Sequence, residues 1–101
     1  MNLLERLAEE RRLCILRMLA EMPESTANES VVGTGLDHFG LPASRSIVRA
    51  DLQFLIEHGL ARVEKLQTGS GELWVAHLTP DGDDVAYGRS VHPGVKRRGP
   101  D

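Results

Sequence analysis

The chain has 101 residues, of which 41% are hydrophobic and only 4% aromatic, so its length and composition fit one small domain with a thin core. Its formal net charge of -3 argues against a protein that coats nucleic acid without regard to sequence. The single cysteine excludes an intrachain disulfide and a cysteine-based zinc site. No stretch approaches the roughly 20 apolar residues of a membrane span. We therefore expect a cytoplasmic protein without cofactor or membrane contact.

Residues 2–21 have a helical pattern that begins at a potential N-cap, Asn2. The first half is amphipathic, whereas residues 13–20 are apolar on nearly every side except at Arg17. A helix of this kind is either the central helix of the fold or half of a dimer interface through its amino-terminal leucines. Cys14 lies inside the apolar run, where we expect a small buried hydrophobic side chain rather than a redox or metal-sensing thiol.

A second helix is expected to follow. Thr26 with Glu29 three residues later fits a capping box that starts a helix near Ala27. Its buried side is predicted by apolar residues at i, i+4 and i+7, namely Val32, Leu36 and Phe39. Gly40 closes this helix, and Leu41-Pro42-Ala43 forms a tight corner. Two helices joined in this way have the form of a helix-turn-helix, although an ordinary helical hairpin shares these signals.

The third helix has the strongest signals, because Ser44 can cap its start and Gly59 occupies the position of a left-handed terminating residue. Its apolar arc consists of Ile47, Val48, Leu52, Phe54, Leu55 and Ile56. The opposite face consists of Ser46, Arg49, Ala50, Gln53 and Glu57, with Arg45 beside it. Asp51 falls inside the apolar arc, and because a buried carboxylate requires a partner, we expect it to pair with Arg17.

Two short strands are predicted next, over residues 61–66 and 73–78, joined by a Gly-Ser-Gly tip within residues 68–71. Such a tip can follow a phosphate backbone through its N–H groups, and Arg62 and Lys65 lie on the adjacent strand. Glycines also occur in tight turns for purely conformational reasons. The tip therefore fits a nucleic-acid contact and an ordinary hairpin equally well.

Thr79 is the expected cap of a short last helix, with Pro80 at its first position and acidic residues at the positive end of its dipole. That position explains the acidic residues without a metal ion. The periodic pattern then stops, which predicts one domain over residues 1–88 and an extended basic arm over residues 89–101. Three cations of this arm are available to phosphates or to an acidic partner, or serve solubility alone: Lys96, Arg97 and Arg98.

The whole order of elements resembles the winged helix-turn-helix fold. The motifs that carry the resemblance are Asp51-Leu52-x-x-Leu55 before His58-Gly59-Leu60, and later Leu78-Thr79-Pro80-Asp81-Gly82. The chain looks most like the small ArsR-like transcriptional regulators. Its two ends, Asn2-Leu3-Leu4-Glu5-Arg6 and Pro93-Gly94-Val95-Lys96-Arg97, are similar to those of short proteins encoded in Mu-like phages and prophages. The resemblance implies a mostly α protein with a small β-hairpin (α+β), in the order α-α-α-β-β-α.

In that fold the third helix enters the major groove and the hairpin wing touches the neighbouring DNA backbone. The resemblance therefore implies base reading by Arg45, Ser46, Arg49 and Gln53. It implies phosphate contact by the helix cap, the hairpin tip and the strand beside it, namely Ser44, Gly69, Ser70, Gly71, Arg62 and Lys65. Metal sensors of the family use cysteine and histidine ligands, and because Cys14 stands alone we do not expect metal-triggered release from DNA.

These expectations combine into a sequence-specific regulator of phage or prophage genes that binds double-stranded DNA as a homodimer through its N-terminal helix. The alternative is an adaptor of winged-helix shape that binds a phage or host protein instead of DNA, through the amino-terminal leucines or the basic arm. The net negative charge of the chain favours this alternative. An enzyme is not expected, since no nucleophile has a recognisable setting and the four histidines lie in four different elements: His38, His58, His77 and His92.

Overall fold

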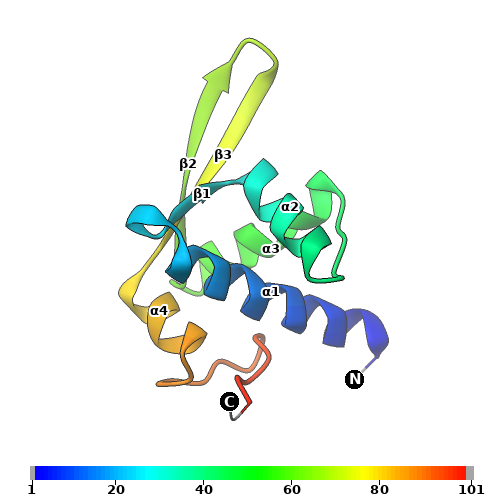
Figure 1. Ribbon diagram of the computed structural model, residues 1–101, viewed down its shortest axis with the longest axis vertical. Coiled ribbons are helices and arrows are strands. Elements are labelled where there is room, and N and C mark those ends of the chain that lie inside the picture. Colours follow the sequence, from blue (N-terminus) through cyan, green and yellow to red (C-terminus); the bar gives the residue numbers. More distant parts are fainter. Residues whose placement is uncertain (1, 100–101) are drawn as a thin grey trace.

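A computed structural model describes residues 2–99, which form an α+β domain with four α-helices, a short 3-10 helix and a three-stranded antiparallel sheet. The elements are α1 (Leu3–Glu21), η1 (Pro23–Ser25), β1 (Thr26–Asn28), α2 (Glu29–His38), α3 (Arg45–Glu57), β2 (Ala61–Thr68), β3 (Gly71–Leu78) and α4 (Pro80–Ala86). The helices surround the base of the sheet, and the β2–β3 hairpin projects beyond them (Figure 1). Within the described residues, no helix combines the length and the apolar character that crossing a membrane requires.

The predicted N-caps of α1, α3 and α4 and the predicted end of α3 are confirmed. The side chains of Asn2, Ser44 and Thr79 each accept a hydrogen bond from the backbone N–H three residues later, which satisfies a donor that the first helical turn leaves unpaired. Gly59 ends α3 with a φ of 71°, and the N–H of Leu60 donates back to a carbonyl oxygen in the last turn at 2.8 Å. Each of these signals is local in sequence, so it could be recognised without knowledge of the fold.

The segment that was predicted to be a capping box forms a strand. Thr26–Asn28 is β1, which pairs antiparallel with β3 and places Thr26 opposite His77. The second helix therefore begins at Glu29, and Asn28 is its N-cap. The predicted order α-α-α-β-β-α was wrong at this point, because three residues are too few for an alternating pattern to identify a strand.

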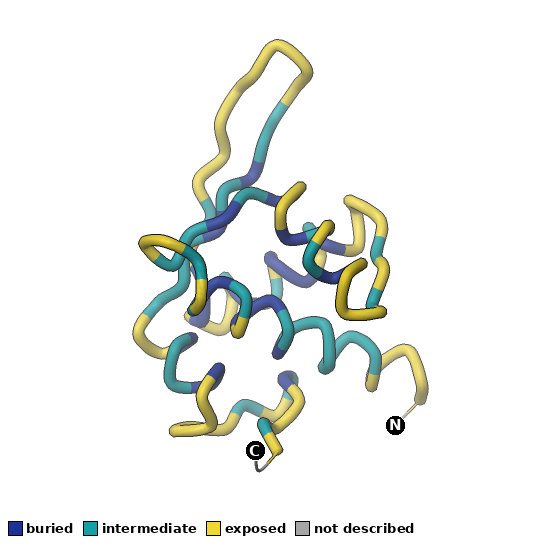
Figure 2. The backbone as a smooth tube through the Cα atoms, in the orientation of Figure 1, coloured by how far each residue is buried: buried dark blue, intermediate teal, exposed yellow. Residues whose placement is uncertain are grey.

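The sheet has the order β1-β3-β2, and the hairpin is longer than predicted. β2 and β3 pair in register from Ala61 opposite Leu78 to Thr68 opposite Gly71, so a turn of two residues joins them. Buried residues of the hairpin extend outward only as far as Trp74 on β3; beyond it β2 is exposed and β3 is half-buried or exposed (Figure 2). The outer half of the hairpin is therefore held by its own ladder rather than by the core.

The core lies where α1 crosses the base of the sheet and the inner faces of α2 and α3. Its fully buried large side chains are Ile15, Leu16, Leu19, Val32, Leu36, Val48, Leu52 and Leu55. Among the aromatic side chains, Trp74 is buried and Phe54 is partly buried. Phe39, which was predicted on the buried side of the second helix, is 60% exposed, and Tyr87 is 41% exposed. Both are C-cap residues, so they lie just past the helical turns that face the core.

Asp51 is buried as predicted, with 2% of its surface exposed, but its expected partner was wrong. Its carboxylate lies 2.6 Å from Nε of Arg11 and 3.6 Å from Nε of Arg12. At about 100° per residue, Arg17 points well away from the face of α1 that carries Arg12. Asp51 therefore joins α3 to the middle of α1, and Arg17 remains on the exposed side of that helix.

The C-terminal segment over residues 89–99 contains no helix or strand, and it folds back over α1 (Figure 1). Val95 is 4% exposed, and the backbone N–H of Lys96 donates to the carbonyl oxygen of Glu9 at 3.1 Å. The ammonium group of Lys96 lies 2.7 Å from the Glu10 carboxylate. The described part of the predicted basic arm is thus packed against the domain; its last two residues lie outside the described part of the chain.

Two histidines join this C-terminal segment to the end of α3. Nε2 of His92 lies 3.0 Å from Nδ1 of His58, and the His58 ring stacks on Phe54. Burial lowers the pKa of His92, and the nearby charges of His58 and Arg12 lower it further. The packed arrangement therefore favours the neutral imidazole of His92.

Acidification is expected to destabilise the protein through His92. An imidazole whose pKa is lower in the folded state binds more protons when the chain is unfolded. Its contribution to stability is therefore complete above the unfolded pKa and is lost as pH falls from the unfolded pKa through the folded pKa. We expect the urea midpoint to decrease between about pH 7.5 and about pH 5.5. His92→Gln should flatten this dependence, whereas the control His38→Gln at an exposed site should retain it. An equally steep decrease in His92→Gln would contradict the assignment.

Two glycines are expected to respond in opposite ways to substitution by alanine. A Cβ on Gly82 would overlap the carbonyl oxygen of Leu60, so Gly82→Ala should destabilise the fold by about 2 kcal/mol or more. Gly33 has open space around it in the middle of α2, so Gly33→Ala should stabilise the fold by about 0.5–1 kcal/mol. Urea denaturation of both variants measures the difference, and a neutral Gly82→Ala would show that α4 does not pack closely on Leu60.

Candidate functional site

The outer face of α3 is a strip of short or polar side chains. Its exposed members, from the N-cap onward, are Ser44, Arg45, Ser46, Ala50, Gln53 and Glu57. The predicted apolar arc faces the core as expected, except that Ile47 is 42% exposed. Near its C-terminal end the Gln53 amide donates a hydrogen bond to the Glu57 carboxylate at 3.2 Å, and both side chains are exposed.

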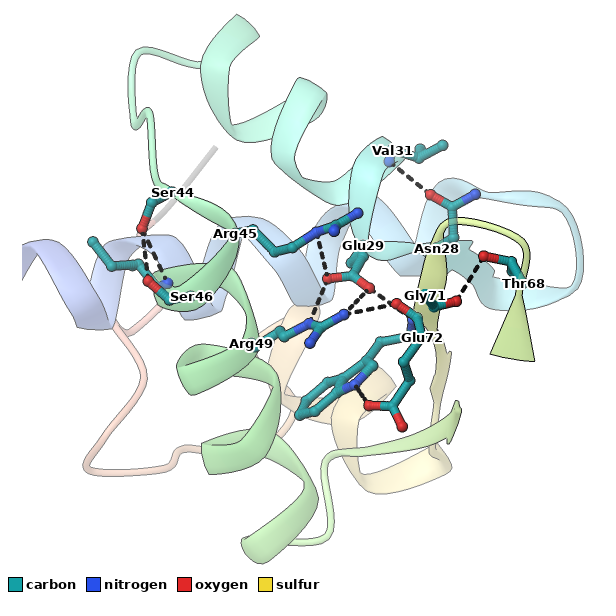
Figure 3. Close-up of polar contacts among 12 residues, drawn as sticks. Asn28, Glu29, Val31, Ser44, Arg45, Ser46, Arg49, Thr68, Gly71 and Glu72 are labelled. Atoms are coloured by element: carbon teal, nitrogen blue, oxygen red, sulfur yellow. Dashed lines mark hydrogen bonds and ion pairs between the residues drawn. The ribbon is translucent and has the colours of Figure 1, made fainter. Parts of the chain in front are cut away.

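The carboxylate of Glu29 lies between α3 and the sheet and is almost completely buried, with a side-chain exposure of 1%. It accepts two hydrogen bonds from Arg49, from Nε at 2.7 Å and from Nη2 at 2.8 Å (Figure 3). It also accepts the backbone N–H of Trp74 at 2.8 Å. Nη2 of Arg49 in turn donates to the carbonyl oxygen of Glu72 at 2.9 Å. One carboxylate thus joins the start of α2, the middle of α3 and the middle of β3.

The electrostatics of this cluster favour its charged form. The hydrogen bond from Arg49 lowers the pKa of Glu29 despite the opposing effect of burial, and the Trp74 N–H and the charge of Arg45 lower it further. The same hydrogen bond raises the pKa of Arg49. Both groups are therefore ionised at neutral pH. Because the folded pKa of Glu29 lies below its ordinary value, its stabilising contribution is present above that value and is lost as pH falls through the folded pKa.

The structure separates the two arginines that were expected side by side on the outer face of α3. Arg45 remains 60% exposed, with its Nε 3.3 Å from Glu29. Arg49 is turned inward: its side chain is 28% exposed and its guanidinium lies 5.0 Å from the centre of the Trp74 ring. A helical wheel could not reveal this, because the groups that draw Arg49 inward come from another helix and from a strand. Arg49 therefore holds α3 against the sheet.

The two cationic side chains of the hairpin, those of Lys65 and Arg62, also lie apart from each other. Lys65 is opposite Trp74 in the β2–β3 ladder, and its ammonium lies 4.5 Å from the centre of that ring, on the side of the hairpin that faces α3. Arg62 is three residues earlier on the same strand, so its side chain projects from the other face. The predicted tip residues Gly69, Ser70 and Gly71 are all exposed at the far end. Lys65 and the tip can act together with α3, whereas Arg62 points away.

The cations of the C-terminal segment are not brought to α3. Lys96 is paired with Glu10 on α1, and the guanidinium of Arg98 lies 5.4 Å from the centre of the Tyr87 ring at the end of α4. Arg97 is exposed on the same segment. In Figure 1 this segment lies below α1, on the opposite side of that helix from the hairpin. The structure therefore does not join these residues to the outer face of α3.

Sequence reasoning missed the two residues that organise this region, Glu29 and Trp74. Glu29 was assigned to a capping box, and Trp74 was only part of a predicted strand. Their hydrogen bond spans 45 positions, and the pair between Glu29 and Arg49 spans 20. No short-range pattern in the sequence signals such contacts; only the burial of an acidic residue in the folded chain identifies them.

Removal of the Glu29 charge is expected to destabilise the fold. Glu29→Gln keeps an acceptor for Trp74 but leaves Arg49 without its ion-pair partner in a poorly hydrated position, which should cost about 2–3 kcal/mol. The control is Glu64→Gln, which removes an exposed carboxylate on β2 and should change stability by less than about 0.5 kcal/mol. Urea denaturation at neutral pH provides the comparison. Equal stability of the two variants would show that the cluster does not hold α3.

The sequence was compared with known proteins, and no family model matches it. It is 43% identical over 94 residues to the uncharacterized protein gp26 of Escherichia phage Mu, and the match covers 93% of each chain. It is 41% identical over 69 residues to an uncharacterized protein of Haemophilus influenzae, and this match covers 68% of the present chain and 67% of the other. These identities extend over most of each protein. The chain therefore belongs to the same family as gp26 of phage Mu.

Proposed function

We propose that this protein is a winged helix-turn-helix regulator that binds double-stranded DNA at specific sequences and acts on phage or prophage genes. In this proposal α2 and α3 are the helix-turn-helix pair and the β2–β3 hairpin is the wing. The observation that carries it is the exposed strip of short side chains on α3, which lies at the foot of a hairpin that projects beyond the domain (Figure 1). A helix enters the major groove only if such an unobstructed face is available. The relative in phage Mu supports the assignment to phage genes.

Base reading is assigned to Arg45, Ser46 and Gln53, with the small side chain of Ala50 allowing close approach to the base edges. A guanidinium has five N–H donors, so the contact of Arg45 with Glu29 leaves donors for the O6 and N7 atoms of a guanine. The same contact limits the orientations that the long Arg45 side chain adopts. Arg49, which we had expected to read bases, is reassigned to positioning α3 against the base of the wing.

Contact with the DNA backbone is assigned to Ser44 at the start of α3, to Lys65 and to the exposed tip at residues 69–71. Lys65 is held beside Trp74 on the side of the hairpin that faces α3, where a phosphate next to the bound groove would lie. Backbone N–H groups of the tip can approach phosphates closely because two of its three residues are glycines. With few cations and a net charge of -3, binding is expected to be weak except at the correct sequence.

Substitution of single cations tests the assignment. After selection of bound oligonucleotides from a random pool, Arg45→Ala should cost about 1–3 kcal/mol at one base pair and relax specificity there. Lys65→Ala should weaken binding to all sequences alike and reduce the salt slope by about one. Arg62→Ala, on the face of the hairpin that points away from α3, is the matched control and should bind like the wild type. Fluorescence anisotropy measures all three, and absence of any binding by the wild type at low salt would refute the proposal.

A protein-binding adaptor remains the second candidate, and one structural observation favours it. Leu3 and Leu4 are 69% and 76% exposed at the end of α1 that projects from the domain, where they offer an apolar contact to another protein. The net charge of -3 agrees with a partner other than DNA. Co-purification of one phage or host protein, together with indifference to Arg45→Ala, would favour the adaptor over the DNA-binding regulator.

A further inference from the structure

Ile47 is a large apolar side chain beside the short and polar side chains that α3 exposes. It was predicted in the apolar arc of that helix, but the structure leaves it 42% exposed. It lines a shallow hollow of about 580 Å³ between the outer face of α2, the turn before α3 and the start of α3. At about 100° per residue, Ile47 and Arg45 project from opposite sides of α3. Arg45 extends toward Glu29 and the sheet, whereas Ile47 extends toward the hollow.

Small side chains line most of this hollow. Besides Ile47 and Asp37, its walls consist of Ser30, Gly33, Thr34, Pro42, Ala43 and Ser44. Their hydroxyl groups are neutral hydrogen-bond donors that phosphate oxygens can accept from. Of the described residues that line the hollow, only Asp37 is charged, and it lies in the last turn of α2. The hollow therefore offers room and neutral donors along most of its length and repels an anion only at the end of α2.

Gly33 lies in the middle of α2, where the packing of the described residues does not require a glycine. It is absent from the glycines with positive φ, and a Cβ there would meet no atom within 4 Å. Gly35 differs, because a Cβ there would overlap Sδ of Met18. A glycine inside a helix is less favourable than alanine, and close approach of a second backbone is one reason for its presence. Gly33 therefore marks the part of the hollow that a partner's backbone can approach most closely.

The dimensions of the major groove bring the two sides of α3 to different DNA strands. A helix with its side chains is about 10–12 Å across and the groove is about 12 Å wide, so opposite flanks of the helix face opposite strands. The flank with Arg45 then faces one strand, and the flank with Ile47 faces the other, whose backbone passes along the hollow. Among the base edges in this groove, only thymine presents an apolar group, its C5-methyl. An exposed isoleucine therefore fits a thymine better than any other base.

We propose that Ile47 contacts the C5-methyl group of a thymine on the strand opposite the guanine that Arg45 reads, and that the backbone of this strand lies in the hollow beside Gly33. The hydroxyl groups of Ser30 and Thr34 donate to its phosphates. The contact depends on the proposed binding of DNA by α3. It adds an apolar base contact to the polar ones and determines which strand carries each base.

Removal of single methyl groups tests the base. In a duplex selected from a random pool, each thymine is replaced in turn by deoxyuridine, which lacks only the C5-methyl. One replacement, opposite the strand of the guanine identified with Arg45→Ala, should weaken wild-type binding about fourfold, the value for burial of one methyl group. Ile47→Ala should bind the thymine duplex at least about fourfold more weakly and lose most of the difference between the two duplexes. The matched control is Val31→Ala, at an equally exposed site on α2, which should keep the wild-type difference.

Gly33 separates a role in DNA binding from a role in folding. Gly33→Gln should be at least as stable as the wild type in urea, because glutamine favours helix more than glycine and the hollow gives its side chain room. It should nevertheless bind DNA about tenfold more weakly, since that side chain occupies the space of the DNA backbone. Val31→Gln, on the opposite side of α2, is the control and should bind like the wild type. Neither Gly33→Gln nor Ile47→Ala should change the salt slope, because neither removes a charge.

Fluorescence anisotropy measures all affinities, and circular dichroism verifies that each variant is folded. Three results would overturn the contact but leave the proposed DNA binding intact: specific binding without a thymine whose methyl group couples to Ile47, a coupled thymine on the strand of the guanine, or wild-type affinity of Gly33→Gln. Absence of wild-type binding at low salt would overturn both.

Discussion

The orientation of α3 depends on the burial of one carboxylate, that of Glu29. A charge in this position is tolerated only if its oxygens are fully hydrogen-bonded, and Arg49 and the backbone N–H of Trp74 meet that requirement. These partners come from α3 and β3, so neither element can move relative to α2 without leaving a buried charge unpaired. The hairpin is fixed to the helices through the same contacts.

A second carboxylate holds the other side of α3. Asp51 is nearly as buried as Glu29 and binds Arg11 and Arg12 of α1. Aliphatic side chains fill most of the core, and their contacts are not directional, so they tolerate small rotations of a helix. Ion pairs and hydrogen bonds with defined geometry do not. The two carboxylates, one on each side, therefore determine how α3 is rotated about its own axis.

That rotation decides which side chains of α3 face the solvent. It turns Arg49 toward Trp74 and leaves Arg45, Ser46 and Gln53 outside, which is why the proposed contact with DNA uses the latter set. α1 is likewise divided into a buried side and an exposed stripe, and the C-terminal segment packs over it next to Glu10.

The sequence by itself determined α1, α3, α4 and the hairpin, together with the caps at Asn2, Ser44 and Thr79 and the end of α3. These features depend on residues within about one helical turn or on alternation along a single strand, so the necessary information is local. Only the tertiary structure decided that residues 26–28 form a strand, which partners Asp51 and Glu29 bind, and that Arg49 faces inward. Each of these depends on contacts between residues 20 to 51 positions apart, because the energy of a buried charge or of an added strand is set by neighbours that the fold brings together.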